Sequence, residues 1–393
     1  MLVSSPAERV LLLAPSNGLG GGIERYLSTV QAAFDLYGVP YRRIDLTWPG
    51  NHNGPRAKLR FVREVTHALR TSIGPVQLIF AHNNLLPVLR IVAPMRHFAG
   101  ATAILYGREI WSARRPRGWR TMRRSDVRVI TISQFSAGAL AQACQTNVNV
   151  LQPGISLDWY QSLVEAGGRT RSASDHIELI SVFRLLEWRV KGLDTLLDAI
   201  ELLGDNRIRL TVCGSGPIPA DLAAAVAGRS WCRIAADLAD EVLAEQLAAA
   251  DLCVLATRTR YGKGSCGEGF GLVLVEAQLA GTPVVAPAYG GSWDTFQHGL
   301  TGLAPTDESP EALARVLATL LYDQQRLTEM GHAATAWTRA RFEPCGYAPF
   351  AIETLLGLPA PLTTHTRDIV PVRSNYPVER FTDDLETDAM TDR

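Results

Sequence analysis

The order of apolar segments constrains the fold of this chain more than any other feature. Short runs rich in β-branched residues alternate with longer amphipathic stretches through most of its 393 residues. This alternation is typical of parallel sheets whose strands are joined by crossover helices. Helices are predicted at Ile23–Ala33 and Arg60–Ser72, among strands at Val10–Ala14, Tyr41–Asp45, Val76–Ala81, Ala101–Tyr106, Val127–Ile132 and Val148–Leu151.

A second series of strands follows a break in the pattern. The break comprises Gln152-Pro153-Gly154 and the polar segment Gly167–Asp175, which we interpret as an interdomain linker. Beyond it, strands are predicted at Ile177–Phe183, Arg207–Cys213, Cys232–Ala236, Leu252–Ala256 and Val284–Ala286. We therefore predict an α/β chain with two facing parallel sheets and a ligand site in the cleft between them, beyond the carboxyl ends of the strands.

Size and composition agree with two domains. A chain that is 47% hydrophobic at this length can bury two cores. We assign residues 1–165 to the first domain and 175–345 to the second. Near the end of the chain, helices are predicted at Ala333–Glu343 and Tyr347–Leu358. Residues 367–393 are polar and acidic with few apolar side chains, so we expect this tail to be disordered.

The sequence favours a cytoplasmic protein. No apolar run reaches the roughly 18–20 residues that cross a bilayer, and Arg9–Ala14 is better interpreted as a first strand than as part of a signal peptide. The six cysteines show no Cys-x-x-Cys spacing, so we expect reduced core thiols rather than disulfides or a zinc site.

Charge is unevenly distributed although the formal net charge is zero. Residues 1–165 contain 19 Lys and Arg against 9 Asp and Glu, whereas residues 166–393 contain 20 against 30. Much of the positive excess lies in the Arg108–Arg128 region, where Trp111 and Trp119 are interspersed. Such a region fits an anionic membrane surface or a phosphorylated acceptor. A solvated arginine-rich loop is the alternative, and no recognition motif for nucleic acid accompanies the charge.

A glycine-rich motif with two glutamates carries the most chemical information. In Gly267–Ala277, Glu268 lies in a glycine-rich turn and Glu276 lies eight residues later, inside an apolar run that predicts a helix from Phe270 to Gly281. The first amides of a helix favour an anion. The two carboxylates are too far apart to contact the same ligand atom. They can instead contact the two ends of one elongated ligand that carries a phosphate between them.

This motif, followed by Ala280–Ala286 and Gly290-Gly291, resembles the donor site of retaining group 1 (family 4) glycosyltransferases. The resemblance implies two facing Rossmann-like domains (the GT-B architecture) and a nucleoside-diphosphate-sugar donor. It implies that Glu268 contacts the donor sugar and that Glu276 binds the ribose. It also places the amides of Gly269, Phe270, Gly271 and Leu272 near the phosphate, and it predicts that residues 346–366 cross back to the first domain.

Two cations complete the predicted donor site. Arg184 ends a strand in Ser181–Leu185, and Lys191 precedes a helix in Lys191–Leu196, which suits a diphosphate at one sheet edge. Their arrangement matches the family's Arg-Leu…Lys-Gly signature, in which both neutralise the leaving nucleotide. The turn containing Gly214 and Gly216 resembles a family turn near the base.

The first domain carries a glycine loop of its own, Gly18–Arg25. It fails the Gly-x-Gly-x-x-Gly fingerprint of nicotinamide enzymes, because the position that requires the last glycine is Ile23. It resembles the family's loop over the donor phosphate, which assigns that role to Gly21 and Gly22. Since no Asp-x-Asp or clustered metal ligands occur, we expect no metal and no cofactor.

The resemblance departs from the family on the acceptor side. Many members carry His-Gly-x-Glu after the fourth strand, whereas this chain has Tyr106-Gly107-Arg108-Glu109. A phenol can hydrogen-bond a sugar, but its pKa near 10 makes it a poor base at neutral pH. His82 ends a neighbouring strand and is a candidate acceptor contact. Ser133 is predicted to cap the next helix.

The resemblance predicts transfer of a sugar to an acceptor hydroxyl of a glycan, glycolipid or small molecule, with retention of anomeric configuration. Two alternatives stay open. One is a same-fold epimerase or phosphorylase. The other is a nucleotide-sugar-binding protein without catalysis, which Tyr106 makes conceivable.

Overall fold

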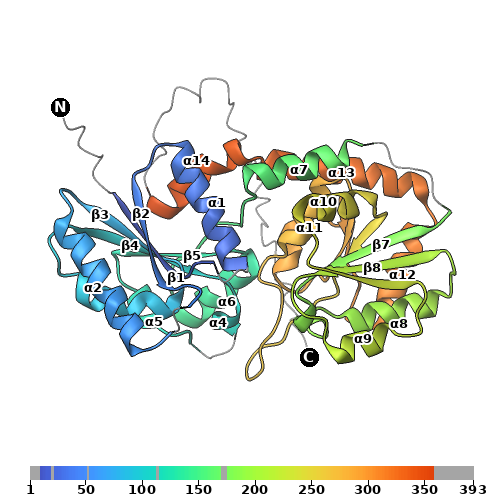
Figure 1. Cartoon of the computed structure of the whole chain (residues 1–393), viewed down its shortest axis with the longest axis horizontal. Helices are drawn as coiled ribbons and strands as arrows, with labels where there is room; N and C mark the ends of the chain where they lie inside the picture. Colours follow the sequence, from blue (N-terminus) through green and yellow to red (C-terminus); the bar gives the residue numbers. More distant parts are fainter. Residues whose placement is uncertain (1–8, 19–21, 51–52, 112–114, 170–174, 358–393) are drawn as a thin grey trace, which may run out of the picture.

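The computed structural model describes residues 9–18, 22–50, 53–111, 115–169 and 175–357. It contains two six-stranded sheets side by side, and every pairing between their strands is parallel (Figure 1). The predicted fold class, α/β with two Rossmann-like sheets, is confirmed.

The first sheet has the strand order β2-β1-β3-β4-β5-β6. Val10 of β1 pairs with Tyr41 of β2 on one side and with Gln77 of β3 on the other. The order therefore reverses between β1 and β3, which is the kind of position where open α/β sheets bind ligands. The strands are β1 Val10–Ser16, β2 Tyr41–Thr47, β3 Val76–Phe80, β4 Phe98–Leu105, β5 Val127–Thr131 and β6 Asn149–Val150.

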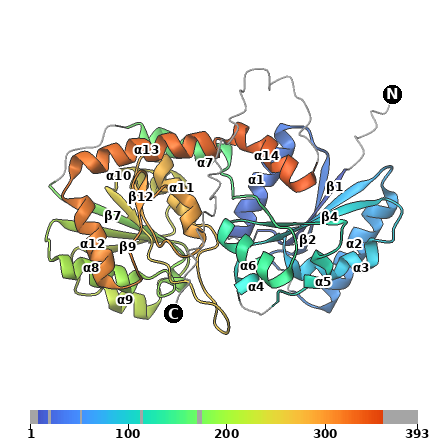
Figure 2. The same cartoon turned by 180° about the vertical axis from the view of Figure 1, so that it is seen from behind.

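Both faces of this sheet are buried under helices. Side chains alternate along β1: Leu12 belongs to the core under α1 (Gly22–Leu36), while Leu11 and Leu13 belong to the core on the other face. This alternation is the two-residue period of a strand. The second face is covered by α2 Pro55–Thr71, η1 Asn83–Val88, α3 Leu89–Val92, α4 Arg108–Trp111, α5 Trp119–Met122 and α6 Gln134–Cys144. Figure 2 shows α2, α3, α4, α5 and α6 on this side. Ser133 caps α6 as predicted, accepting from the Ser136 amide at 3.2 Å.

The second sheet has the order β12-β11-β10-β7-β8-β9, which reverses between β7 and β10. Its sixth strand, β12, escaped prediction because two residues that include Gly302 give no apolar pattern. A Cβ on Gly302 would lie 2.5 Å from the Val284 carbonyl oxygen, so glycine is needed for this pairing. The strands are β7 Ile177–Val182, β8 Ile208–Gly214, β9 Cys232–Ala236, β10 Leu252–Val254, β11 Val284–Val285 and β12 Gly302–Leu303.

One helix of the second half lies across the domain boundary that the sequence predicted. Helix α7, Leu157–Gly167, packs against α10 and α11, although our division at residue 165 assigns most of it to the first domain. The other elements are η2 Leu185–Glu187, α8 Leu193–Leu203, α9 Ala220–Val226, α10 Asp240–Ala249, α11 Leu272–Leu279, η3 Gly291–Thr295, α12 Pro310–Leu321 and α13 Gln324–Phe342.

The last described helix returns to the first half. Helix α14, Pro344–Leu356, packs against α1, and the Tyr347 hydroxyl donates to the Gln152 carbonyl oxygen at 2.9 Å (Figures 1 and 2). The predicted tail at 367–393 lies outside the described residues. All six cysteines are free thiols, and four of them are buried.

Candidate active site

Three of the predicted donor residues lie at the point where the second sheet reverses its strand order. Arg184 follows β7, Lys191 precedes α8, and Glu268 lies in the connection from β10 to α11. Because β7 and β10 are neighbours and parallel, their carboxyl ends open at the same edge. The Lys191 Nζ atom lies 2.7 Å from the Glu268 Oε2 atom.

This ion pair is shielded from water on most sides. The Lys191 side chain is 14% exposed and that of Glu268 is 16% exposed. Arg184 is exposed, and its side chain makes no hydrogen bond or ion pair with any residue that the structure describes. The edge therefore offers one oriented cation–carboxylate pair and one free guanidinium that can bind paired anionic oxygens.

The glycines around Glu268 let the second half approach the first. A Cβ on Gly269 would lie 2.6 Å from the Tyr106 carbonyl oxygen, and a Cβ on Gly267 would lie 3.0 Å from the Trp111 ring. Gly271 has φ +95° and caps α11, which begins at Leu272, two residues later than predicted. Because Gly271 has a left-handed backbone conformation, the helix cannot include it and begins only at the next residue.

The Phe270 side chain is not available to a donor. It is 2% exposed and its ring centroid lies 6.2 Å from that of Phe342 in the core. Only the Phe270 backbone can face a ligand, together with the amide of Leu272 at the start of α11.

Glu276 lies in the middle of α11 and is 4% exposed. Its Oε1 atom accepts from Trp159 Nε1 at 3.0 Å and from Arg25 Nη1 at 3.5 Å. Burial raises the pKa of Glu276, and Arg25 and Trp159 oppose that rise. Sequence reasoning missed both partners. The position of Arg25 directly after the first glycine loop was the available signal, whereas nothing local marks Trp159.

The other predicted donor glycines have different surroundings. Gly21 lies outside the described residues. Gly22 begins α1, and among the described residues no atom outside its chain neighbours and its own helix backbone lies within 4 Å of the position that its Cβ would take. A Cβ on Gly214 would lie 2.0 Å from the Phe183 carbonyl oxygen, so this glycine is required by packing. The Gly216 amide donates to Asp237 at 2.9 Å.

The three acceptor-side residues lie at the carboxyl edge of the first sheet. The Glu109 carboxylate accepts from the amides of Tyr106 at 2.5 Å and of Gly107 at 3.2 Å. His82 Nδ1 accepts from the Asn84 amide at 3.1 Å; burial lowers the pKa of His82, and the nearby Glu109 carboxylate opposes this. Glu109 thus stabilises the loop that positions Tyr106.

The Tyr106 phenol is kept neutral by its surroundings. Burial and the Glu109 carboxylate raise its pKa well above the ordinary value. Its ring packs edge-on against Tyr26 at 5.7 Å between centroids, and its hydroxyl has no hydrogen-bond partner in the described part of the chain. Tyr106 can donate a hydrogen bond, but it is no base at neutral pH.

An aromatic wall that the sequence did not predict stands beside Glu268. The Phe135 ring contacts Trp111, Tyr261 and Tyr289, with centroids 5.8, 5.9 and 5.1 Å away. The Gly262 amide donates to the Trp111 carbonyl oxygen at 2.9 Å, which joins the two halves. Tyr261 and Tyr289 are about half exposed. The four residues of this wall are far apart in the sequence, so no local sequence pattern could predict that their rings meet.

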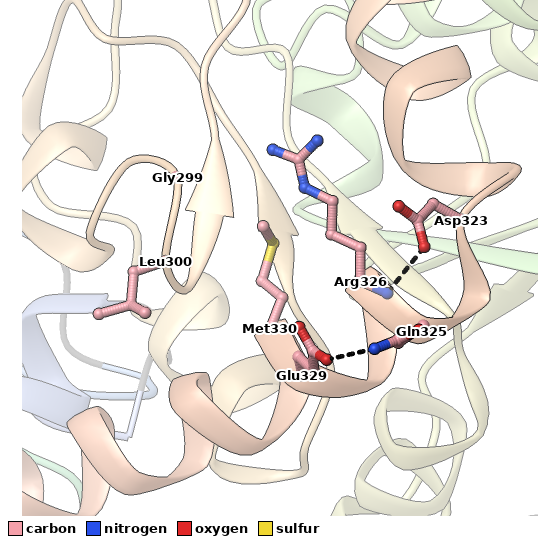
Figure 3. Close-up of a pocket in the computed structure, with 7 residues that line it drawn as sticks. All are labelled: Gly299, Leu300, Asp323, Gln325, Arg326, Glu329 and Met330. Carbon is pink, nitrogen blue, oxygen red and sulfur yellow. Dashed lines mark hydrogen bonds between the residues drawn. The ribbon is translucent and has the colours of Figure 1, made fainter.

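A separate hollow of about 520 Å³ lies between the Gly299-Leu300 turn and the start of α13 (Figure 3). Two hydrogen bonds join residues that line it. The Arg326 amide donates to Asp323 at 3.0 Å, and Gln325 Nε2 donates to Glu329 at 2.9 Å. It contains none of the predicted donor or acceptor residues. Across the described residues, no group of three or more His, Cys, Asp or Glu could hold a metal ion.

The second half of the chain matches a known family. Residues 177–323 match the model described as "Glycosyl transferases group 1". The chain is 30% identical over 275 residues to the GDP-mannose-dependent alpha-(1-6)-phosphatidylinositol monomannoside mannosyltransferase of Mycolicibacterium smegmatis. The aligned region covers 63% of this chain and 69% of that protein. The chain is 32% identical over 227 residues to the D-inositol 3-phosphate glycosyltransferase of Streptomyces scabiei, covering 53% and 49%.

Solved structures agree on the fold. The Anabaena protein HepE in complex with UDP superposes with a TM-score of 0.66 at 20% identity, covering 89% of this chain and all of that one. A sucrose-phosphate synthase from Thermosynechococcus elongatus gives 0.67 at 18% identity, covering 87% and 96%. With its GT-B architecture and a relative that is 30% identical over most of that relative's length, this chain belongs to the group 1 glycosyltransferases.

Proposed function

We propose that this chain is a retaining, metal-independent glycosyltransferase that moves a sugar from a nucleoside diphosphate to an acceptor hydroxyl. One observation carries the proposal. Arg184 and the Lys191–Glu268 pair follow the two neighbouring strands, β7 and β10, between which the second sheet reverses its order, and the loop that carries Glu268 also contacts the Tyr106 backbone. A departing diphosphate needs such cations, and a sugar beside it needs a hydrogen-bond acceptor.

Each of these residues contacts a different part of the donor. Arg184 and Lys191 bind the diphosphate, and the first amides of α11 add partial positive charge. Glu268 accepts from sugar hydroxyls, and Glu276 accepts from the ribose. These groups stabilise the negative charge that develops on the leaving diphosphate, which is the role that Mg²⁺ has in other transferases.

The acceptor side supports a front-face route. The bond from the anomeric carbon to the diphosphate oxygen breaks, and the acceptor oxygen bonds to the same face of that carbon. The acceptor proton passes to a diphosphate oxygen. The surroundings of Tyr106 and Glu109 support this route, because the phenol keeps its proton and the carboxylate is engaged by two amides. His82 is the remaining candidate base.

The donor can be identified by ligand-induced stabilisation. The names of the relatives include GDP-mannose, and HepE has been crystallised with UDP-glucose. Thermal unfolding should therefore be followed with GDP, UDP, ADP and dTDP and their common sugars, with a chelator present. A ligand at about 100 times its Kd stabilises by about 2.7 kcal/mol, which gives a clear shift. No shift with any nucleotide would contradict the donor site.

Arg184→Ala and Glu268→Gln should each reduce turnover by roughly 10²–10³-fold while the protein stays folded, since each removes a charge contact to the donor. Arg189→Ala is the matched control, because Arg189 is also exposed but stacks on Trp188 at 4.0 Å and pairs with Asp221. Parent-like turnover in the first two variants would disprove the assignment.

Product analysis tests the remaining parts of the proposal. NMR of the product should show the anomeric configuration of the donor, and inversion would exclude the front-face route. His82→Gln should leave this outcome and most of the rate unchanged. Donor consumption with and without acceptor separates transfer from epimerisation or phosphorolysis. Donor binding without turnover would indicate a non-catalytic protein.

A further inference from the structure

The connection from β10 to α11 contains a hairpin at the boundary of the two halves (Figure 1). The Arg260 amide donates to the Cys266 carbonyl oxygen at 2.9 Å, and the Cys266 amide donates to the Arg260 carbonyl oxygen at 3.2 Å. The Arg260 guanidinium contacts both oxygens of the Glu308 carboxylate, at 2.9 and 2.5 Å. The second half therefore holds the base of this hairpin, residues 260–266.

The tip of the hairpin reaches the first half. The Gly262 amide donates to the carbonyl oxygen of Trp111 in α4 at 2.9 Å. Gly262 and Gly264 have φ of +84° and +81°, which suits the tight turn between the paired residues. The hairpin thus carries Tyr261 to Phe135 of α6, where the two ring centroids lie 5.9 Å apart in the aromatic wall.

Two of the four rings of the wall are open to a ligand. Tyr261 is 46% exposed and Tyr289 is 55% exposed, with their centroids 6.4 Å apart. Phe135 contacts both rings, and the buried Trp111 contacts Phe135. Burial and a hydrogen bond with Tyr289 raise the pKa of Tyr261 to about 12, so its phenol is neutral. The wall therefore presents two uncharged tyrosines on a fixed backing.

The wall lies directly beside the proposed donor site. The Gly291 amide donates to the Glu268 carbonyl oxygen at 2.9 Å, and the Thr259 hydroxyl donates to the Tyr289 carbonyl oxygen at 3.2 Å. The proposed donor extends from its ribose at Glu276 to its sugar at Glu268. Glu276 is held by α1 and α7, whereas the wall includes rings from α4 and α6. The wall is thus placed beyond the sugar end of the donor, where the acceptor must lie.

The basic region predicted at Arg108–Arg128 contributes Trp111 to the wall, and its cations have other surroundings. Arg124, for example, is paired with Asp126 at 2.6 Å. Arg114 lies outside the described residues. A membrane surface or a phosphorylated acceptor for this region stays a prediction, and in the described part of the chain no helix is long and apolar enough to cross a membrane. The four rings of the wall carry no charge, so the ligand that suits them is a neutral one.

A sugar ring fits two exposed tyrosines. The faces of a pyranose carry C–H bonds, and its hydroxyls project from the rim. The face of an aromatic ring carries negative partial charge, which attracts the polarised C–H bonds, while the phenol hydroxyls can hydrogen-bond the rim. An alkyl chain would offer no partner to either phenol, and a phosphate would find no cation among the four rings.

We propose that the aromatic wall is an acceptor subsite in which a sugar ring stacks on Tyr261 and Tyr289 and directs one of its hydroxyls to the donor sugar at Glu268. This inference rests on the proposed transferase function, and it narrows the acceptor to a carbohydrate. The hairpin is then the element that selects the acceptor, because it places Tyr261 in the wall.

Saturation-transfer NMR tests the subsite without turnover. Maltose, lactose and mannobiose are the probes, each with and without GDP or UDP. At least one should receive saturation through its ring protons. Tyr261→Ala and Tyr289→Ala should each weaken its binding by roughly five- to tenfold, since each removes a stacking partner. Tyr261→Phe keeps the ring and should keep most of the binding. Thermal unfolding establishes that each variant is folded.

Tyr322→Ala is the matched control. Tyr322 is also about half exposed, at 52%, but it lies beside Arg207 at the opposite edge of the second sheet, so alanine there should bind the saccharides like the parent. Calorimetric titration with GDP and UDP separates donor from acceptor. Tyr261→Ala should leave the nucleotide affinity unchanged, whereas Arg184→Ala should weaken it.

Four results would overturn the subsite. They are no saccharide signal that depends on Tyr261, equal losses in Tyr261→Phe and Tyr261→Ala, a loss of nucleotide affinity in Tyr261→Ala, or a Tyr261-dependent signal from decanoate or 4-nitrophenol alone. Saccharide binding that depends on Tyr261 in a protein that binds no nucleotide would support the subsite and contradict the proposed donor site.

Discussion

At the residue scale, Glu276 combines a structural cost with the binding role proposed for it. It is a carboxylate buried in an apolar helix, and its Oε1 atom is held by Trp159 and by Arg25 of the first half. Its pKa is raised by burial, so the folded state binds a proton more readily than the unfolded chain. The protonated side chain therefore contributes to the free energy of unfolding in full below the ordinary pKa of 4.5. This contribution is lost as pH rises through the raised pKa of the folded state.

Glu276→Gln should keep or increase stability at pH 7 and weaken nucleotide binding by roughly 10–100-fold, since a hydrogen bond to a charged group contributes about 1.5–3 kcal/mol. In thermal unfolding from pH 4 to pH 7, the unfolding temperature of the variant should rise relative to that of the parent as pH passes through the raised pKa of Glu276. Calorimetric titration with the nucleotide supplies the affinity. A parent that gains stability relative to the variant with rising pH would contradict the sign of this pKa shift.

At the element scale, the connection from β10 to α11 positions the site. Three glycines meet different demands: Gly267 and Gly269 allow close approach to the first half, and Gly271 takes the left-handed conformation that starts α11. From Leu274 to Leu279 every residue of α11 is buried, which holds Glu276 in a packed helix, while Glu268 lies in the loop four residues before the helix begins.

Gly269→Ala should lower turnover by about 10²-fold without unfolding the protein, because a Cβ there would lie 2.6 Å from the Tyr106 carbonyl oxygen and must displace one loop. Gly138→Ala is the matched control. Gly138 lies inside α6 with no atom within 4 Å of a Cβ, so alanine should be neutral or slightly stabilising. Steady-state kinetics and thermal unfolding of both variants provide the check, and a fully active Gly269→Ala enzyme would refute the close approach.

At the scale of the whole molecule, the two halves are joined at several places. Helix α14 packs on α1, and Asp294 of the second half accepts from the Gln134 amide at the start of α6 at 2.6 Å. A single core cluster extends from α1 and α14 through α7 into the second sheet. The halves should consequently unfold together.

Removing residues 344–393 should lower the unfolding temperature and separate the transition into two, because α1 loses the apolar cover of Tyr347, Ala351 and Leu355. Removing only residues 358–393, which the sequence predicts to be largely a disordered tail, should leave one unchanged transition. Differential scanning calorimetry of both truncations decides the matter. A single unshifted transition after the longer truncation would show that α14 does not stabilise the first half.

Local patterns in the sequence determined the two sheets and most of their strands, because strand periodicity depends on neighbouring residues. The motifs around Arg184, Lys191, Glu268 and Glu276, with the family resemblance that they carry, made these residues the candidates for the donor site. Only the tertiary structure decided what these residues touch. The Trp159 and Arg25 contacts to Glu276 and the aromatic wall join segments tens to hundreds of residues apart. Such contacts are set by packing between elements, and no short stretch of sequence records which surfaces will meet.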